Sequence, residues 1–208
     1  MDCIRHALGR LTGNPAHGGF QIYTIAKEIT VAPIPDAIPY EQAVVLPLAI
    51  STAAAGLYQK GFLALPYPTI NPKSSGKTIL IWGGSSSVGS TAIQLAVGSG
   101  LEVISTASKK NLDYVKGLGA KHVFDHSSAT VTEDILARLK GTDFAGAYDA
   151  ISSPETLKAS GEIVHQLGGG TIATVLSTPA GGLLSNVTAV GGENTFLFEV
   201  LGILMTNL

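Results

Sequence analysis

Thr78-Ile-Leu-Ile-Trp-Gly-Gly-Ser-Ser-Ser-Val-Gly89 is the stretch that decides the fold of this chain. Its first part, residues 78–82, is β-branched or large and apolar, which predicts a buried strand. Glycines and serines follow, and apolar residues then recur at helical spacing over residues 88–96. The stretch is therefore expected to form a strand, a tight turn and a helix.

The turn has the composition of a phosphate-binding site. A helix N-terminus presents unpaired amides and a partial positive charge, and a turn without bulky side chains lets a diphosphate approach them. The best GxGxxG frame has Ser86 at its middle glycine, where a hydroxyl can also donate to phosphate. The alternative is a strand-to-helix turn that binds nothing. The expected cofactor-binding residues are Gly84, Ser85, Ser86, Ser87, Val88 and Gly89.

Strand and helix patterns alternate along the rest of the chain. Strands are expected at 101–106, 122–125, 146–151, 171–176 and 186–190. Helical spacing lies between them, at 112–118, 131–139 and 157–164. This alternation predicts an α/β fold of the Rossmann type, a doubly wound parallel sheet with helices on both faces. A ligand should then bind at the carboxyl ends of the strands.

The end of the second predicted strand indicates which dinucleotide is bound. An Asp or Glu about twenty residues beyond the first glycine usually holds a free ribose 2′-hydroxyl. Ser108, Lys109 and Lys110 stand there instead, and hydroxyl and ammonium groups suit a 2′-phosphate. We therefore expect NADPH rather than NADH. The alternative is that the two lysines belong to a solvated helix start.

Six short motifs occur in order along the chain. They are Gly18-Gly-Phe-Gln-Ile-Tyr23, Ile34-Pro-Asp36, Glu41-Gln-Ala-Val-Val-Leu-Pro47, Ser51-Thr-Ala53, Ile81-Trp-Gly-Gly-Ser-Ser-Ser-Val-Gly-Ser90 and Leu118-Gly-Ala-Lys-His-Val-Phe-Asp125. This series resembles the medium-chain dehydrogenase/reductase superfamily, and within it the branch of zinc-independent quinone oxidoreductases and fungal trans-enoyl reductases. The resemblance extends from about Gly18 to Val190.

The resemblance implies a GroES-like catalytic domain, built from both ends of a longer chain, around an inserted Rossmann domain. Residues 1–60 are expected to be a partial GroES-like segment that ends in a hinge helix over 47–58. Residues 61–195 would be the NADP-binding Rossmann domain, and residues 196–208 the start of the return to the catalytic domain. We expect either a truncated product or a degenerate relative.

The resemblance also implies roles for residues outside the glycine turn. Thr52 would contact the nicotinamide ribose or the substrate carbonyl; otherwise its hydroxyl bonds to its own helix. His126 stands where relatives usually have a tyrosine near the 2′-phosphate, and it is equally explained as a surface histidine. Leu176 and Ser177 would pass beside the nicotinamide ring. Asp149, inside a predicted strand, is expected to bond to neighbouring backbone rather than to act in catalysis.

Composition excludes several other classes of protein. The net charge of −2 offers no basic face for nucleic acid, and no apolar run reaches the ~20 residues of a membrane-spanning helix. Cys3 is the single cysteine, and the histidines lack partners at ligand spacing, so we expect no metal. A cytoplasmic location is the default, because residues 1–10 lack the apolar core of a secretory signal. Exposure of the apolar tail at 196–205 would favour self-association as a homo-oligomer.

The chemistry implied by the resemblance is zinc-independent hydride transfer from NADPH to a conjugated carbonyl: a quinone, an enone or an enoyl thioester. The protein would orient the nicotinamide and stabilise the developing enolate. Water or a hydroxyl such as that of Thr52 would deliver the proton. One alternative is a truncated, non-catalytic NADP(H)-binding module or partner subunit. A structural α/β domain without nucleotide is the other.

Overall fold

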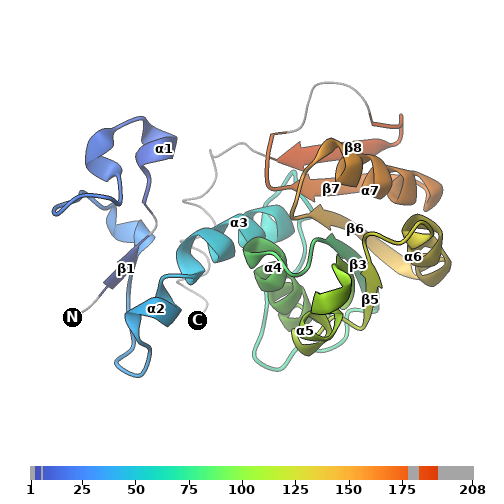
Figure 1. The fold of residues 1–208 in the computed structure, drawn as a ribbon, viewed down its shortest axis with the longest axis horizontal. Helices are drawn as coiled ribbons and strands as arrows, with labels where there is room; N and C mark the ends of the chain where they lie inside the picture. The colour runs from blue at the N-terminus through green and yellow to red at the C-terminus, as the bar shows by residue number, and fades with distance from the viewer. Residues whose placement is uncertain (1–2, 6, 178–182, 192–208) are drawn as a thin grey trace.

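The computed structural model describes residues 3–5, 7–177 and 183–191. A six-stranded sheet with helices around it forms the main part, and a smaller N-terminal segment lies to one side (Figure 1). All neighbouring strands of this sheet pair in parallel, in the order β5-β4-β3-β6-β7-β8. The strands are β3 (Lys77–Trp82), β4 (Glu102–Ala107), β5 (His122–Asp125), β6 (Asp143–Asp149), β7 (Gly170–Thr174) and β8 (Val187–Gly191). The predicted doubly wound sheet is confirmed.

The helices cover both faces of the sheet. They are α3 (Leu46–Tyr58), α4 (Ser87–Gly98), α5 (Leu112–Gly117), α6 (Val131–Leu139) and α7 (Pro154–Gln166), with a short 3-10 helix η3 (Lys109–Asn111) before α5. Ile79 and Ile81 of β3 pack with α3, α4 and α5, whereas Leu80 and Trp82 pack with α6 and α7. Because successive side chains of a strand point to opposite faces, a strand buried on both sides is apolar throughout.

The chain reverses its winding direction at β3. Strands β4 and β5 lie on one side of β3, and β6, β7 and β8 lie on the other. In such a sheet, the crevice beyond the carboxyl ends of the two central strands is the usual position for a ligand. Trp82 and Asp149 are the last paired residues of β3 and β6. The candidate site is therefore built from the residues that follow them.

Helix α3 is joined to the sheet by close contacts. The Tyr148 hydroxyl on β6 donates to the carbonyl oxygen of Thr52 at 3.0 Å. A Cβ atom at Gly56 would overlap the Tyr148 ring, so the absence of a side chain allows this approach. The Tyr58 hydroxyl donates to the carbonyl oxygen of Leu95 on α4 at 3.1 Å. The helix expected over 47–58 is thus present and packs on the Rossmann core.

The N-terminal segment contains short elements. Strand β1 (Cys3–Arg5) pairs antiparallel with β2 (Val31–Pro33). The Arg5 side chain donates to the Gly18 carbonyl oxygen at 2.9 Å and to the Thr24 hydroxyl at 2.6 Å. The remaining elements are α1 (Gly9–Thr12), η1 (Pro15–His17), η2 (Glu28–Thr30) and α2 (Tyr40–Ala43).

The expected domain division stays a prediction. Residues 192–195 of its Rossmann part and the whole of 196–208 lie outside the described residues. Within the part of the chain that the structure describes, no helix has the length and apolar character needed to cross a membrane.

Candidate cofactor-binding site

The glycine turn is fastened to the carboxyl end of β4. Gly83 has a φ of +81°, which favours glycine, and its amide donates to the Thr106 hydroxyl at 3.0 Å. The Gly84 amide donates to the Thr106 carbonyl oxygen at 2.8 Å, and the Ser86 amide to the Gly83 carbonyl oxygen at 3.0 Å. Thr106 is fully buried. Its bonds to the glycine turn were not predicted, although Thr106 is the last residue of the strand expected at 101–106.

Both outer glycines of the fingerprint occupy sites without room for a side chain. A Cβ atom at Gly84 would overlap the Ser105 hydroxyl and lie 2.8 Å from Cδ1 of Ile93. A Cβ atom at Gly89 would overlap the carbonyl oxygen of Gly83. The strand and helix therefore approach each other as closely as the dinucleotide-binding fingerprint requires.

Ser86 explains how the fingerprint tolerates a serine at its middle position. Its φ of −72° is accessible to any residue, and its hydroxyl oxygen caps α4 by accepting the Gly89 amide at 3.0 Å. The amides of Ser87 and Val88 belong to the first turn of α4, where no intrahelical acceptor exists. The turn thus fits a diphosphate at the positive end of a 12-residue helix. Donation from the Ser86 hydroxyl to phosphate stays a prediction.

The residues expected to bind a 2′-phosphate follow directly after β4. Ser108 is half-buried and receives a hydrogen bond from the Asn111 side chain at 3.1 Å, and Lys109 and Lys110 are exposed. The His126 amide donates to the Ala107 carbonyl oxygen at 3.1 Å, which brings the end of β5 beside the residue preceding Ser108. His126 is also exposed, so both explanations of this residue stay open.

A carboxylate that was not predicted from the sequence lies at the same edge. Asp125 ends β5, and its side chain accepts hydrogen bonds from the Ser127 amide at 3.0 Å and the Ser127 hydroxyl at 2.7 Å. These bonds lower the pKa of Asp125, and the nearby charges of His126 and Lys109 lower it further. Asp125 therefore stays ionised at neutral pH and offsets part of the positive charge of Lys109.

The end of β6 is organised by a buried carboxylate. Asp149 is fully buried, and its Oδ1 accepts the amides of Ile151 at 3.0 Å and Ser152 at 2.9 Å. Its Oδ2 accepts the Thr156 hydroxyl at 2.6 Å, and Thr156 forms a capping box with Ser153 at the start of α7. The predicted bonding of Asp149 to neighbouring backbone is confirmed. These bonds also end the strand at Asp149, and β6 begins at Asp143, so the predicted range of 146–151 was wrong at both ends.

Ile151 brings an apolar side chain to the crossover between β3 and β6. The residue is 42% exposed. A Cβ atom at Gly83 would lie 2.6 Å from Cγ1 of Ile151, so Ile151 packs directly against the glycine turn. The Ala150 amide donates to the Trp82 carbonyl oxygen at 3.0 Å, which continues the pairing beyond the strands. Ile151 is a residue of the candidate site that was not predicted from the sequence.

The three residues expected near the nicotinamide lie in two places, one on α3 and two just after β7. Thr52 is half-buried on α3, where its backbone carbonyl receives the Tyr148 hydroxyl. Leu176 and Ser177 are exposed just beyond β7, and the Leu176 carbonyl oxygen accepts the Thr174 hydroxyl at 2.8 Å. Their contacts with a nicotinamide stay predictions.

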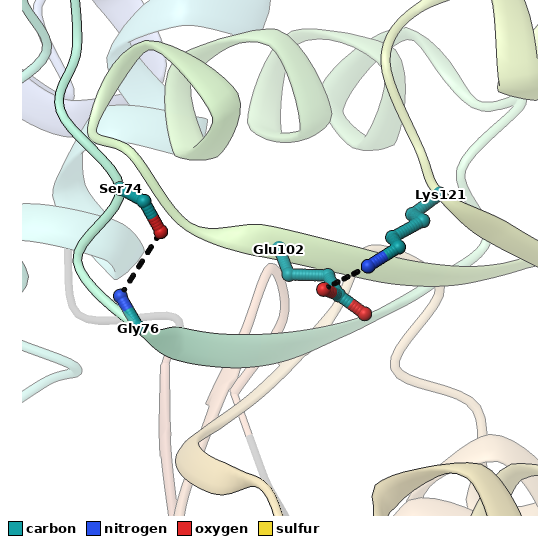
Figure 2. Close-up of polar contacts among 4 residues, drawn as sticks. All are labelled: Ser74, Gly76, Glu102 and Lys121. Carbon is teal, nitrogen blue, oxygen red and sulfur yellow. Dashed lines mark hydrogen bonds and ion pairs between the residues drawn. The ribbon is translucent and has the colours of Figure 1, made fainter.

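A depression of about 330 Å³ lies at the opposite edge of the sheet. Among its lining residues, Glu102 and Lys121 form an ion pair at 2.6 Å, and the Ser74 hydroxyl accepts the Gly76 amide at 3.3 Å (Figure 2). Glu102 begins β4, so this is the amino edge of the strands. The depression therefore lies at the edge opposite the glycine turn, and its two charged residues pair with each other.

A metal centre is not formed by the side chains described. Over residues 3–5, 7–177 and 183–191, no group of three or more His, Cys, Asp or Glu could hold a metal ion. Cys3, the single cysteine of the chain, is exposed. The described residues therefore do not fit a zinc ion.

Comparison with known proteins gives the class. The model of the zinc-binding dehydrogenase family matches residues 87–194, just over half of the chain. The chain therefore belongs to this family, within the medium-chain dehydrogenase/reductase superfamily.

Individual relatives agree with this assignment. The trans-enoyl reductase himH of Aspergillus japonicus is 51% identical over 187 residues, which cover 90% of this chain and 53% of that protein. An alcohol dehydrogenase superfamily protein from Novosphingobium aromaticivorans superposes with a TM-score of 0.67 at 30% identity, covering 86% of this chain and 52% of that one. A mycobacterial protein complexed with NADPH shares the fold, with a TM-score of 0.62 at 21% identity over 88% of this chain and 58% of its own. The chain spans about half the length of these relatives.

Proposed function

We propose that this chain binds NADPH across the carboxyl edge of its sheet. The observation that carries the proposal is the close-packed turn at the start of α4 together with Ser108 and Lys109 at the end of β4. The turn would hold the diphosphate, and the hydroxyl and ammonium groups would hold the 2′-phosphate. The NADPH bound to the mycobacterial protein of the same fold supports a nicotinamide cofactor.

We further propose that the chain belongs to an oxidoreductase that reduces a conjugated carbonyl without zinc. The substrate class, a quinone, an enone or an enoyl thioester, is supported by 51% identity to a trans-enoyl reductase. Independence from zinc is supported by the donor set of the described residues, which does not fit the metal. NADPH supplies a hydride when bound. Thr52, Leu176 and Ser177 would orient the nicotinamide, and a cytoplasmic location stays a prediction.

A non-catalytic NADP(H)-binding module or partner subunit is the second candidate. The glycine turn and the end of β4 would support binding of the dinucleotide in this case as well. Self-association through the apolar tail at 196–205, which lies outside the described residues, stays a prediction. Incubation with NADPH and a quinone or enoyl thioester separates the candidates, because oxidation of NADPH requires turnover. Binding without oxidation would favour the module, and failure to bind NADPH would contradict both.

Lys109→Ala is expected to weaken NADPH binding about tenfold, because a charge-assisted bond to the 2′-phosphate is lost. NADH lacks this phosphate, so its affinity should change little. Fluorescence titration with NADPH and with NADH measures the ratio of the two dissociation constants. Lys158→Ala on α7, also an exposed lysine, is the matched control and should change neither affinity. Equal losses for the two dinucleotides would contradict a 2′-phosphate role for Lys109.

A further inference from the structure

Ser152, just beyond β6, has a backbone conformation that is unusual for its residue type. Its φ is +58°, and among the described residues it shares a positive φ with one other non-glycine residue, Ala64. A side chain in this region costs free energy and persists only where surrounding contacts hold it. We therefore expect local contacts of Ser152 to offset the free-energy cost of its backbone conformation.

The Ser152 hydroxyl bridges two strand ends. It donates to the Asp149 carbonyl oxygen at 3.0 Å and accepts the amide of Val175 at 3.0 Å. Asp149 and Thr174 are the last paired residues of β6 and β7, so Val175 is the first residue beyond the ladder. The Ser152 hydroxyl thus accepts the Val175 amide at a point where β6 has ended and no longer pairs with β7. The left-handed conformation of Ser152 places its oxygen in that position.

The segment after β7 also forms a hydrogen bond with its own strand. The Thr174 hydroxyl donates to the Leu176 carbonyl oxygen at 2.8 Å. Leu176 is therefore bonded to its own strand and Val175 to the turn after β6. Ile151, the neighbour of Ser152, packs against Gly83 of the glycine turn. Ser152 consequently connects the turn at the crossover with the segment that follows β7.

We propose that Ser152 is a positioning residue that sets segment 175–177 against the nicotinamide half of bound NADPH. This inference rests on the proposed NADPH site. The strand order β4-β3-β6 places Ser108 and Lys109 on one side of β3 and Ser152 on the other. The 2′-phosphate half of the cofactor would lie toward β4, so Ser152 lies on the side of the remaining half.

Two ligands separate the halves of the site. NADPH occupies both, whereas adenosine 2′,5′-bisphosphate carries the 2′-phosphate and lacks the nicotinamide. Ser152→Ala and Ser152→Gly both remove the hydroxyl, and the glycine variant also relieves the backbone strain. We expect each to weaken NADPH binding about fivefold to tenfold, the effect of one lost hydrogen bond that orders a binding segment. Affinity for the bisphosphate should stay within about twofold of the wild type, within the uncertainty of such titrations.

Ser153→Ala is the matched control. It removes the cap of α7 one residue away, without touching Val175, and should lower thermal stability while leaving both affinities unchanged. Ser152→Gly guards against loss of folding, because glycine accepts a positive φ. Retained NADPH affinity in both Ser152 variants, or equal losses for the two ligands, would overturn the positioning role alone. Failure of the wild type to bind either ligand would overturn the NADPH site and this inference with it.

Discussion

Gly89→Ala is expected to lower NADPH affinity by at least about a hundredfold, because the diphosphate depends on amides that the added methyl group displaces. The new Cβ atom would overlap the Gly83 carbonyl oxygen and lie 2.9 Å from the Ser86 hydroxyl that caps α4. Since a carbonyl oxygen is backbone, relief requires the turn itself to move. Overpacking of this kind also lowers the free energy of unfolding, by about 1–3 kcal/mol. Isothermal titration with NADPH and chemical denaturation measure the two effects.

Gly117→Ala is the control for this substitution. Gly117 ends α5, and a Cβ atom there has no neighbour within 4 Å. The variant should bind NADPH normally and gain up to about 1 kcal/mol of stability, the difference between alanine and glycine in a helix. Wild-type NADPH affinity in Gly89→Ala would show that the turn is not the diphosphate site.

Asp149→Ala is expected to cause the largest loss of stability, about 3–5 kcal/mol. The change leaves the amides of Ile151 and Ser152 and the hydroxyl of Thr156 without their acceptor. NADPH affinity should fall as well, because the turn that carries Ile151 loses its support. Chemical denaturation gives the free energy of unfolding. Asp149→Asn keeps one acceptor oxygen and should lose clearly less, and a loss below about 1 kcal/mol in Asp149→Ala would contradict the structural role.

The fold could be predicted because its signals are local. Residues 78–82 are apolar on both faces of a strand, and helical spacing begins directly after the glycine turn. The C-terminal end of β6 was harder to predict from the sequence. A strand pattern continues to Ile151, but Asp149 diverts the following amides to its own carboxylate. A side-chain acceptor inside an apolar run ends a strand without changing its hydrophobic pattern.

The candidate site could be predicted where backbone geometry requires a residue type, as at Gly84 and Gly89. Thr106 and Ser152 were missed, because their roles depend on which strands become neighbours. Two features of the sequence could have indicated further parts of the site, namely the carboxylate beside the lysine pair and the turn before α7. Asp125 ends a strand adjacent to the lysine pair, and parallel strands end at one edge. Ser153 followed by Pro154 is a typical helix start, which would have placed a turn immediately before it.

The bond between Tyr148 and Thr52 has a consequence for the order of folding. The two residues are 96 positions apart, so helix α3 leaves the ribosome long before β6 exists. Until β6 pairs with β3, α3 can pack on α4 but cannot complete its docking on the sheet. Contacts of such sequence separation form late, because a long loop must close first. During synthesis, the buried face of α3 near Gly56 therefore stays accessible to chaperones until most of the Rossmann core has been translated.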